Sequence, residues 1–402
     1  PDEEENVSIK IRLWDWNLGL SGLCDLSDNS ALLLSNYDID LVYSLKTGHW
    51  EGDDYNYPYI SWADPSGYGR LNGCDDNSIY QNERDSLIVF DITQNDYDGD
   101  NIPYWIEVNN YHTDPQINDT ARDDDGDGVP IEWEFKWGAF RDYDWYSDTW
   151  VFVSYYDPFV WEDHSKFDPD NDGLNNVEEY LTSEWGSDPF RKDIFVELDQ
   201  MEAGPNGEQA SVFPELGKDL LRDAFDKYNI CLHLDDGSMG GGEWIPFDNE
   251  TPREELILLY QDYFIHGDAD NWRKGVFHYG LLVYDATYAG YMFGVDDGYW
   301  GAYQISSSRV DKRSHGAGKA IGYASVYMHE LGHTLDIRIP GGHDEKSGFP
   351  WNINWWKWRP YKSCMNYGYT YLLVDYSDGS RGRNDHDDWS TLDLPAFQRN
   401  VE

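Results

Sequence analysis

Aspartate recurs at every second position in three segments between residues 96 and 179 of this 402-residue chain. Each segment fits a 12-residue template with acids at positions 1, 3 and 5, a backbone carbonyl donor at position 7 and a glutamate at position 12. The template residues are Asp96, Asp98, Asp100, Ile102 and Glu107; Asp123, Asp125, Asp127, Val129 and Glu134; and Asp168, Asp170, Asp172, Leu174 and Glu179. Alternating carboxylates wrap a hard cation, and the distal glutamate closes its coordination shell. The sequence therefore predicts three calcium loops.

Position 6 of such a loop makes a sharp turn that favours glycine. Gly128 and Gly173 fill it in the second and third loops, and Asn101 fills it in the first. Asparagine adopts positive φ more readily than most residues, so the first loop keeps the pattern. A solvated acidic run is the alternative for one loop, but three matches favour cation binding. Residues 93–191 resemble EF-hand-like repeats of the thrombospondin type 3 and dockerin families, which implies structural calcium in an exported protein.

The acidic residues far outnumber the basic ones, with 77 Asp and Glu against 29 Lys and Arg and a formal net charge of −48. Aromatic residues make up 16% of the chain, which is more than a disordered acidic segment carries. A folded surface of this charge repels phosphate groups, so nucleic acid and anionic lipid are excluded as partners. Bound cations or a saline environment must offset the self-repulsion.

Other features predict a secreted or cell-surface protein without membrane insertion. No apolar run approaches the ~20 residues that span a bilayer. N-glycosylation sequons occur at Asn6, Asn118 and Asn249. The four cysteines form no CxxC pair, and their spacing suggests the disulfides Cys24–Cys74 and Cys231–Cys364 in an oxidising compartment.

The patterning along the chain predicts a multidomain protein with three regions. Residues 1–92 contain short apolar segments such as IDLVYSL and SLIVF, which predict an all-β sandwich of roughly seven or eight strands. Residues 93–191 carry the calcium loops, and residues 192–402 mix α and β patterns. In this last region DIFVEL, ICLHL and HYGLLVYDA predict strands, whereas residues 213–228 and 317–335 have helical periodicity.

The helix predicted over residues 317–335 contains the sequence HELGH. His329 and His333 are four residues apart, so both imidazoles can reach one metal ion from the same helix face. Glu330 lies beside them, where its carboxylate can take a proton from a metal-activated water. The motif predicts a zinc site with Glu330 as the general base.

The segment Ser363-Cys364-Met365-Asn366-Tyr367 resembles the methionine turn of metzincin peptidases. Residues 192–402 as a whole resemble an α+β metzincin-like catalytic domain of the archaeal and bacterial secreted type. The resemblance implies Met365 as an apolar floor beneath the metal and Tyr367 as a donor to the oxyanion. It also implies a zinc-dependent metalloendopeptidase acting on a protein or peptide substrate, which pairs with a strand at the edge of the sheet.

The chain departs from the metzincin pattern HExxHxxGxxH at two positions. Asp336 stands where the family has glycine, and Ile339, which cannot bind zinc, stands where it has the third ligand. His343 follows two glycines a few residues later and offers an alternative. The order of preference for the third ligand is His343, then Asp344, then Asp336.

These departures give weight to two other functions. One is a hydrolase that cleaves a different amide, such as one in a cell wall. The other is a non-enzymatic surface or matrix protein that keeps a peptidase fold, uses calcium for rigidity, and self-associates or attaches to a cell surface. The acidic segment around His386 is either a solvated loop or a fourth cation site. The tryptophans of residues 351–358 either pack the lower half of the domain or line a substrate cleft.

Overall fold

The chain divides into two compact units. The computed structural model describes residues 6–17, 20–23, 39–44, 50–52, 69–72, 87–90, 92, 94, 96–144, 149–292, 301–314, 316, 318–338, 341, 343 and 351–400. Unit 1 comprises Pro1–Phe167, Asn175–Leu181 and Asp188–Phe190, and unit 2 comprises Asp168–Leu174, Thr182–Ser187 and Arg191–Glu402. The division into regions 1–92, 93–191 and 192–402 stays a prediction.

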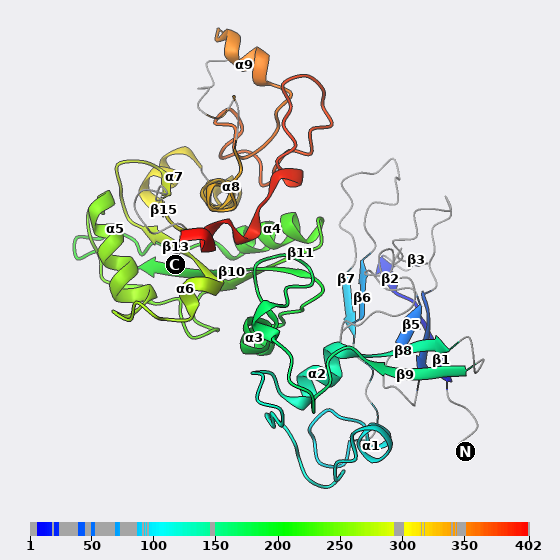
Figure 1. The fold of residues 1–402 in the computed structure, drawn as a ribbon. Coiled ribbons are helices and arrows are strands. Elements are labelled where there is room, and N and C mark those ends of the chain that lie inside the picture. The colour runs from blue at the N-terminus through cyan, green and yellow to red at the C-terminus, as the bar shows by residue number, and fades with distance from the viewer. Residues whose placement is uncertain are drawn as a thin grey trace. The chain divides into compact units, whose positions relative to one another are not determined.

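The N-terminal part of unit 1 is built from antiparallel strands (Figure 1). They are β1 (Asn6–Ile11), β2 (Trp14–Asn17), β3 (Leu20–Leu23), β4 (Ile39–Ser44), β5 (Trp50–Gly52), β6 (Gly69–Asn72) and β7 (Leu87–Phe90). β4 is the central strand of a sheet with β1 and β5, while β2 pairs with β3 and β6 with β7. Leu41, Tyr43 and Trp50 form a small buried core. These strands agree with the predicted β character, and the rest of the predicted sandwich lies outside the described residues.

The remainder of unit 1 contains the first two acidic loops and short helices. Its elements are α1 (Tyr104–Ile106), η2 (Glu107–Tyr111), α2 (Ile131–Gly138), β8 (Ala139–Asp144), β9 (Thr149–Ser154), η3 (His164–Lys166) and most of α3 (Asn176–Thr182). The position-7 residues Ile102 and Val129 are fully buried, each in a small apolar core. The apolar residue of each loop thus anchors the segment that carries the acids.

Unit 2 is a mixed sheet with helices on both faces. Its strands are β10 (Lys192–Met201), β11 (Ile230–Asp235), β12 (Trp244–Ile245), β13 (Phe277–Val283), β14 (Gly290–Met292) and β15 (Ala302–Ser306). Its helices are η4 (Ser183–Trp185), α4 (Glu215–Asp226), α5 (Arg253–Leu259), η5 (Tyr260–Phe264), α6 (Arg273–Val276), α7 (Ser307–Arg313), α8 (Gly318–Thr334), α9 (Ile353–Trp358), η7 (Trp389–Thr391) and η8 (Leu394–Asn400). The strand and helix segments predicted after residue 192 are confirmed to within a few residues by β10, α4, β11, β13 and α8.

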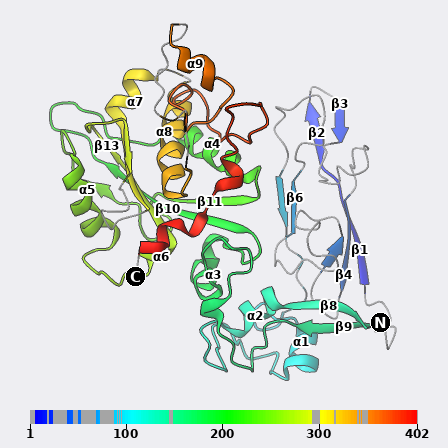
Figure 2. The same ribbon diagram turned by 45° about the horizontal axis from the view of Figure 1, so that its top comes forward.

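The strand order is β11-β10-β13-β15-β14, with β12 also paired to β10. All pairings are parallel except that of β14 with β15, so the last strand of this order runs antiparallel to its neighbour. Alternation along β10 sends Ile194, Val196 and Leu198 into the core shared with α4 and α8. Phe195 and Met201 face the opposite core, under α5 and η5. Figure 2 shows α8 beside α4 on one face of the sheet.

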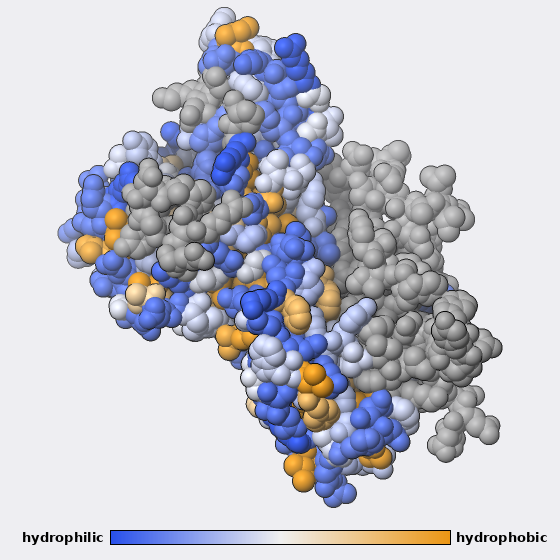
Figure 3. Space-filling view, in the orientation of Figure 1, coloured by the Kyte–Doolittle hydropathy of each residue, from blue (hydrophilic) through white to orange (hydrophobic). Residues whose placement is uncertain are grey.

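Among the described residues, no helix combines the length and the apolar character that a bilayer crossing requires. The face shown in Figure 3 is mostly hydrophilic where residues are described, with only small hydrophobic groups between the polar ones. Several large apolar side chains of unit 2 are nevertheless exposed, among them Trp351, Ile353 and Trp356 in and before α9. This exposure does not match a purely packing role for these three residues.

Candidate metal centre

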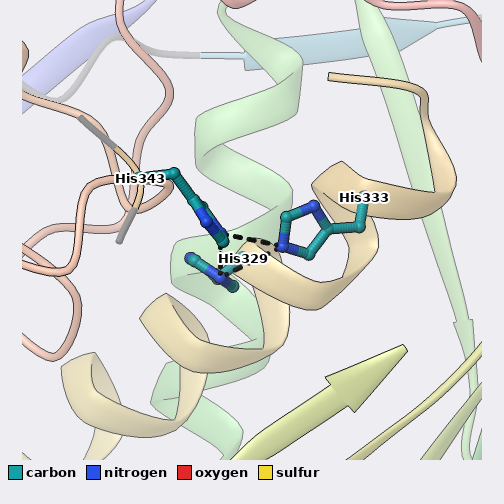
Figure 4. A group of neighbouring side chains, drawn as sticks. All are labelled: His329, His333 and His343. Carbon is teal, nitrogen blue, oxygen red and sulfur yellow. Dashed lines mark hydrogen bonds between the residues drawn. The ribbon is translucent and has the colours of Figure 1, made fainter. Parts of the chain in front are cut away.

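Three histidines converge at the C-terminal end of α8 (Figure 4). His329 and His333 come from consecutive turns of the helix, and His343 comes from the segment that follows it. The Nε2 atoms lie 3.3 Å apart for His329 and His333, 3.2 Å for His329 and His343, and 3.1 Å for His333 and His343. The structure therefore brings together the two HELGH histidines and the residue preferred as third ligand.

This geometry fits a zinc ion. Zn–N bonds of about 2.0–2.1 Å at tetrahedral angles place ligand nitrogens about 3.3 Å apart, which is close to all three Nε2–Nε2 distances. The Nδ1 of His329 donates to the carbonyl oxygen of Cys364 at 2.8 Å, so its Nε2 presents a lone pair. Burial and the two neighbouring imidazoles hold the pKa of His333 well below its usual range, which keeps this ring neutral. Neutral imidazoles with convergent lone pairs are the ligands that zinc requires.

Backbone hydrogen bonds hold the segment that carries His343. The amide of Tyr367 donates to the carbonyl oxygen of His343 at 3.3 Å. The Nε2 of His386 lies 3.1 Å from the carbonyl oxygen of Gly341, and its ring packs against Trp358 and Tyr361. His386 thus contacts the chain two residues before His343, and both sequence interpretations of its acidic segment stay predictions.

Met365 lies beneath the last turns of α8. It is fully buried, and a Cβ added at Gly332 would come within 2.7 Å of its Sδ and 2.9 Å of the hydroxyl of Tyr376. That hydroxyl donates to the carbonyl oxygen of Met328 at 2.7 Å, so it cannot move away cheaply. The glycine of HELGH thus permits the close approach of the segment that resembles a methionine turn.

Glu330 points toward the edge of the sheet. Its side chain is buried, and a Cβ at Gly290 of β14 would lie 2.2 Å from its Oε1. Burial raises the pKa of Glu330 to about 8. A carboxyl group in an apolar site beside a metal position is poised to exchange protons near neutral pH.

The ring of Tyr367 stacks on His329 at a centroid distance of 5.4 Å and lies 4.8 Å from the ring of His343. The residue is 43% exposed, so a substrate can reach it. These contacts bring Tyr367 to the metal centre, as the resemblance implied. Its action on an oxyanion stays a prediction.

The other candidates for the third ligand have different positions. Asp336 has φ +57°, the left-handed turn for which the metzincin pattern uses glycine, and its Oδ1 accepts from Nε of Arg338 at 2.7 Å. Asp336 therefore makes the turn that ends the helix. Asp344 and Ile339 lie outside the described residues.

The three acidic loops share one backbone geometry. Position 6 has positive φ in each loop, at Asn101 (68°), Gly128 (104°) and Gly173 (103°). The position-1 carboxylate accepts from the amide of position 6 in each loop, at 2.8 Å for Asp96, 3.2 Å for Asp123 and 3.1 Å for Asp168. The position-12 residues are almost fully buried: Glu107, Glu134 and Glu179. The positive φ and the hydrogen bond at position 6 match the sharp turn of an EF-hand loop.

The structure adds one candidate ligand to those predicted for the first loop. Asp119 forms a potential cation site with Asp100 and Glu107, and its amide donates to Oδ2 of Asp100 at 3.2 Å. Burial and the neighbouring aspartates raise the pKa of Glu107 to about 7. Sequence reasoning missed Asp119 because the 12-residue template ends at Glu107.

The third loop is divided between the units. Asp168, Asp170, Asp172 and Leu174 belong to unit 2, and Glu179 belongs to unit 1. Within unit 2, Oδ2 of Asp172 accepts from the amide of Asp193 at 2.6 Å. Burial, followed by the charge of Asp193, raises the pKa of Asp172 to about 8.

The expected disulfide between Cys231 and Cys364 is wrong, because both thiols are free. Cys231 lies on β11 beside Asp193 and His233. Cys364 is buried beneath α8, where its carbonyl oxygen orients His329. Sequence spacing suggested the pair, but the fold places the two cysteines in different layers. Cys24 and Cys74 lie outside the described residues.

Two contributors to the centre left no signal in the sequence. They are the carbonyl oxygen of Cys364 and the close approach of Gly290 to Glu330, both contacts between segments far apart in the chain. Comparison of the chain with protein-family models, with curated proteins and with solved structures gives no match.

Proposed function

We propose that the protein is a secreted or cell-surface, calcium-stabilised zinc metalloendopeptidase. The observation that carries this proposal is the convergence of the Nε2 atoms of His329, His333 and His343, at mutual distances of 3.1 to 3.3 Å, beside a buried carboxyl group. Three imidazoles leave a fourth tetrahedral position for water or substrate, which is the arrangement of catalytic rather than structural zinc.

A zinc ion held by His329, His333 and His343 would supply a Lewis acid that polarises a carbonyl group and makes water more acidic. Glu330 takes a proton from the attacking water and delivers it to the amine that leaves. Burial keeps this carboxyl away from bulk solvent, and Tyr367 offers a phenolic hydroxyl on the exposed side of the histidine rings. That hydroxyl donates to the developing oxyanion.

The substrate in this proposal is an extended peptide. β14 is the last strand of the described sheet order, and it carries Gly290, where a Cβ would lie 2.2 Å from Oε1 of Glu330. A peptide that pairs with this strand would present its backbone carbonyls along the line that leads to the metal centre. Exposed Trp351, Ile353 and Trp356 add an apolar surface for side chains of such a peptide.

Calcium in the three acidic loops is the second part of the proposal. The support is the shared backbone geometry of the loops, together with the burial of the acidic residue at position 12 of each. Extracellular calcium is typically millimolar, so sites of modest affinity stay filled.

Metal content tests the zinc site. The full chain, purified with zinc present, should contain a tightly bound zinc ion that is lost when His343→Ala removes one ligand. His266→Asn is the matched control. His266 is exposed, and its positive φ is tolerated by asparagine, so this substitution should not disturb the fold. A chain that binds calcium but no zinc at His329, His333 and His343 would support the matrix-protein alternative.

Hydrolysis of casein or of a peptide library tests the chemistry. Glu330→Gln should lower kcat/KM by about 10²–10⁴-fold and leave the zinc content unchanged, because only the general base is removed. Hydrolysis that survives this substitution at the wild-type rate would contradict the mechanism. Loss of activity together with loss of zinc would point to a structural effect instead.

A further inference from the structure

A second buried histidine faces carboxylates in unit 1. His164 is fully buried at the start of η3, and its Nε2 lies 3.2 Å from Oδ2 of Asp127, 3.8 Å from Oε1 of Glu134 and 3.8 Å from Oε2 of Glu162. Its Nε2 makes no hydrogen bond, and neither do Oε1 of Glu134 and Oε2 of Glu162. Asp127 and Glu134 are ligands expected for the second calcium loop, whereas His164 and Glu162 stand outside its template.

The charges around His164 do not balance. The side chains of Asp127 and Glu134 are 0% and 1% exposed, and that of Glu162 is 28% exposed. One proton on the imidazole would neutralise only one of these three carboxylates. Buried carboxylates without partners are costly, and a cation with more than one charge would balance this cluster.

The histidine is oriented as a metal ligand. Its ring makes edge-on contacts with Tyr156 at a centroid distance of 4.9 Å, with Phe167 at 5.6 Å and with Trp133 at 5.9 Å, which fix its plane. The side-chain amide of Asn176 lies 2.8 Å from Nδ1, and Oδ1 of Asn176 has no hydrogen-bond partner. Rotation of this amide by half a turn places Oδ1 on the Nδ1–H, which leaves the Nε2 lone pair facing the carboxylates.

We propose that His164, Asp127 and Glu134 bind a divalent transition-metal ion of the zinc class, with Glu162 beside it as a further oxygen donor. Calcium takes oxygen ligands, and an imidazole nitrogen in the coordination shell favours zinc and related ions over calcium. The three ligand atoms lie within 4.8 Å of one another. The His164–Asp127 distance of 3.2 Å already matches the spacing of two zinc ligands, about 3.3 Å.

The His164 site differs from the three-histidine centre in its ligand types and in its access to substrate. Its ligands are one nitrogen and several carboxylate oxygens, and aromatic rings enclose the imidazole, so no substrate reaches that side. The ion would be structural: it would occupy the second acidic loop in place of calcium and join that loop to η3 and α3 within unit 1. Its existence does not depend on the peptidase proposal.

The test uses the full chain with His333→Ala, which disables the three-histidine centre, in buffer with millimolar calcium. Titration with Co²⁺, followed by its visible d–d absorption, and zinc content by mass spectrometry should both give one transition-metal ion per chain that calcium does not displace. Adding His164→Asn should abolish this ion. Adding His112→Asn instead is the matched control and should leave it, because His112 is an exposed histidine of the same unit. Absence of the ion before His164 is changed, or its persistence afterwards, would overturn the proposal.

A second measurement avoids the risk that His164→Asn fails to fold. Anomalous scattering on both sides of the zinc edge, from crystals of the unsubstituted chain with two equivalents of zinc, should give one peak beside Nε2 of His164. A peak only at His329, His333 and His343, or a calcium ion alone in the second loop, would overturn the proposal. A peak at His164 without one at the three histidines would keep it and contradict the proposed peptidase.

Discussion

The three-histidine centre and the acidic loops are both arranged for cations, but they differ in what remains when the cation is removed. The histidine centre consists of imidazoles: burial and the neighbouring rings hold the pKa of His333 well below its usual range, and Nδ1 of His329 donates to the carbonyl oxygen of Cys364. The loops bury carboxyl groups, and burial and neighbouring acids raise the pKa of Glu107 to about 7 and of Glu134 to about 9. The first region gathers imidazoles, whereas the second buries acidic groups whose charge a bound cation would neutralise. The comparison indicates that zinc would serve chemistry and calcium would serve folding.

The two regions also differ in how they are held. His329 and His333 lie on a long helix that packs against α4 and against the sheet, so their geometry is set by a large core. The first two acidic loops are held by their own backbone amides and by one apolar side chain at position 7, which is buried in a small core. A small core offers little free energy to offset the repulsion of buried acids.

The largest expected effect follows from removing each ion separately. A calcium chelator should lower the melting temperature strongly, because each site occupied at 100 times its dissociation constant contributes about 2.7 kcal/mol of stability. A zinc-selective chelator should abolish activity while the unfolding of unit 2 shifts far less. Thermal unfolding by circular dichroism with each chelator measures the difference. An unchanged melting temperature after calcium removal would contradict the assignment of the loops.

The second-largest expected effect concerns the packing beneath α8. Gly332→Ala should destabilise the protein by about 1–3 kcal/mol. The alanine Cβ would meet Sδ of Met365 and the hydroxyl of Tyr376, which is held by its hydrogen bond to the carbonyl oxygen of Met328. Gly318→Ala is the control, since nothing lies within 4 Å of a Cβ there, and alanine should stabilise this helix by up to about 1 kcal/mol. Urea denaturation measures both variants. Equal effects of the two substitutions would show that Met365 does not form a tight floor under α8.

The smallest effect tests the acid sensitivity of unit 2. His278 is fully buried, 2.9 Å from the hydroxyl of Thr334, and burial lowers its pKa to about 3. In the unfolded chain this residue takes up a proton near pH 6.5, which the folded protein resists. The stability that neutral His278 contributes is therefore complete above pH 6.5 and is lost as the pH falls towards 3, by up to about 1.4 kcal/mol per pH unit.

The measurement compares the stability of the wild-type chain and of His278→Gln between pH 7 and pH 4. Glutamine does not titrate, so the slope that His278 causes should disappear in the variant. His266→Asn removes an exposed histidine and should leave the slope unchanged. Parallel pH profiles for wild type and His278→Gln would show that this imidazole does not resist protonation.

Local patterns predicted much of both regions. The 12-residue template, the HELGH helix and the strands β10, β11 and β13 depend on spacing within short segments, and the structure has these elements where the sequence indicated them. His343 was ranked first as third ligand only because two glycines precede it, and Asp336 was ranked third. The tertiary structure brings His343 to the other histidines and turns Asp336 toward Arg338.

Ligand type and spacing along a helix or loop are local properties, so sequence patterns alone indicate candidate cation ligands. The packing of distant segments sets which of these candidates meet. It placed Asp119 with the first loop, His164 with the second, and the carbonyl oxygen of Cys364 behind His329. It also left Cys231 and Cys364 as free thiols. These contacts join segments that are distant in the chain, and their positions follow from how the sheet, its helices and the small loop cores pack, which no short spacing rule contains.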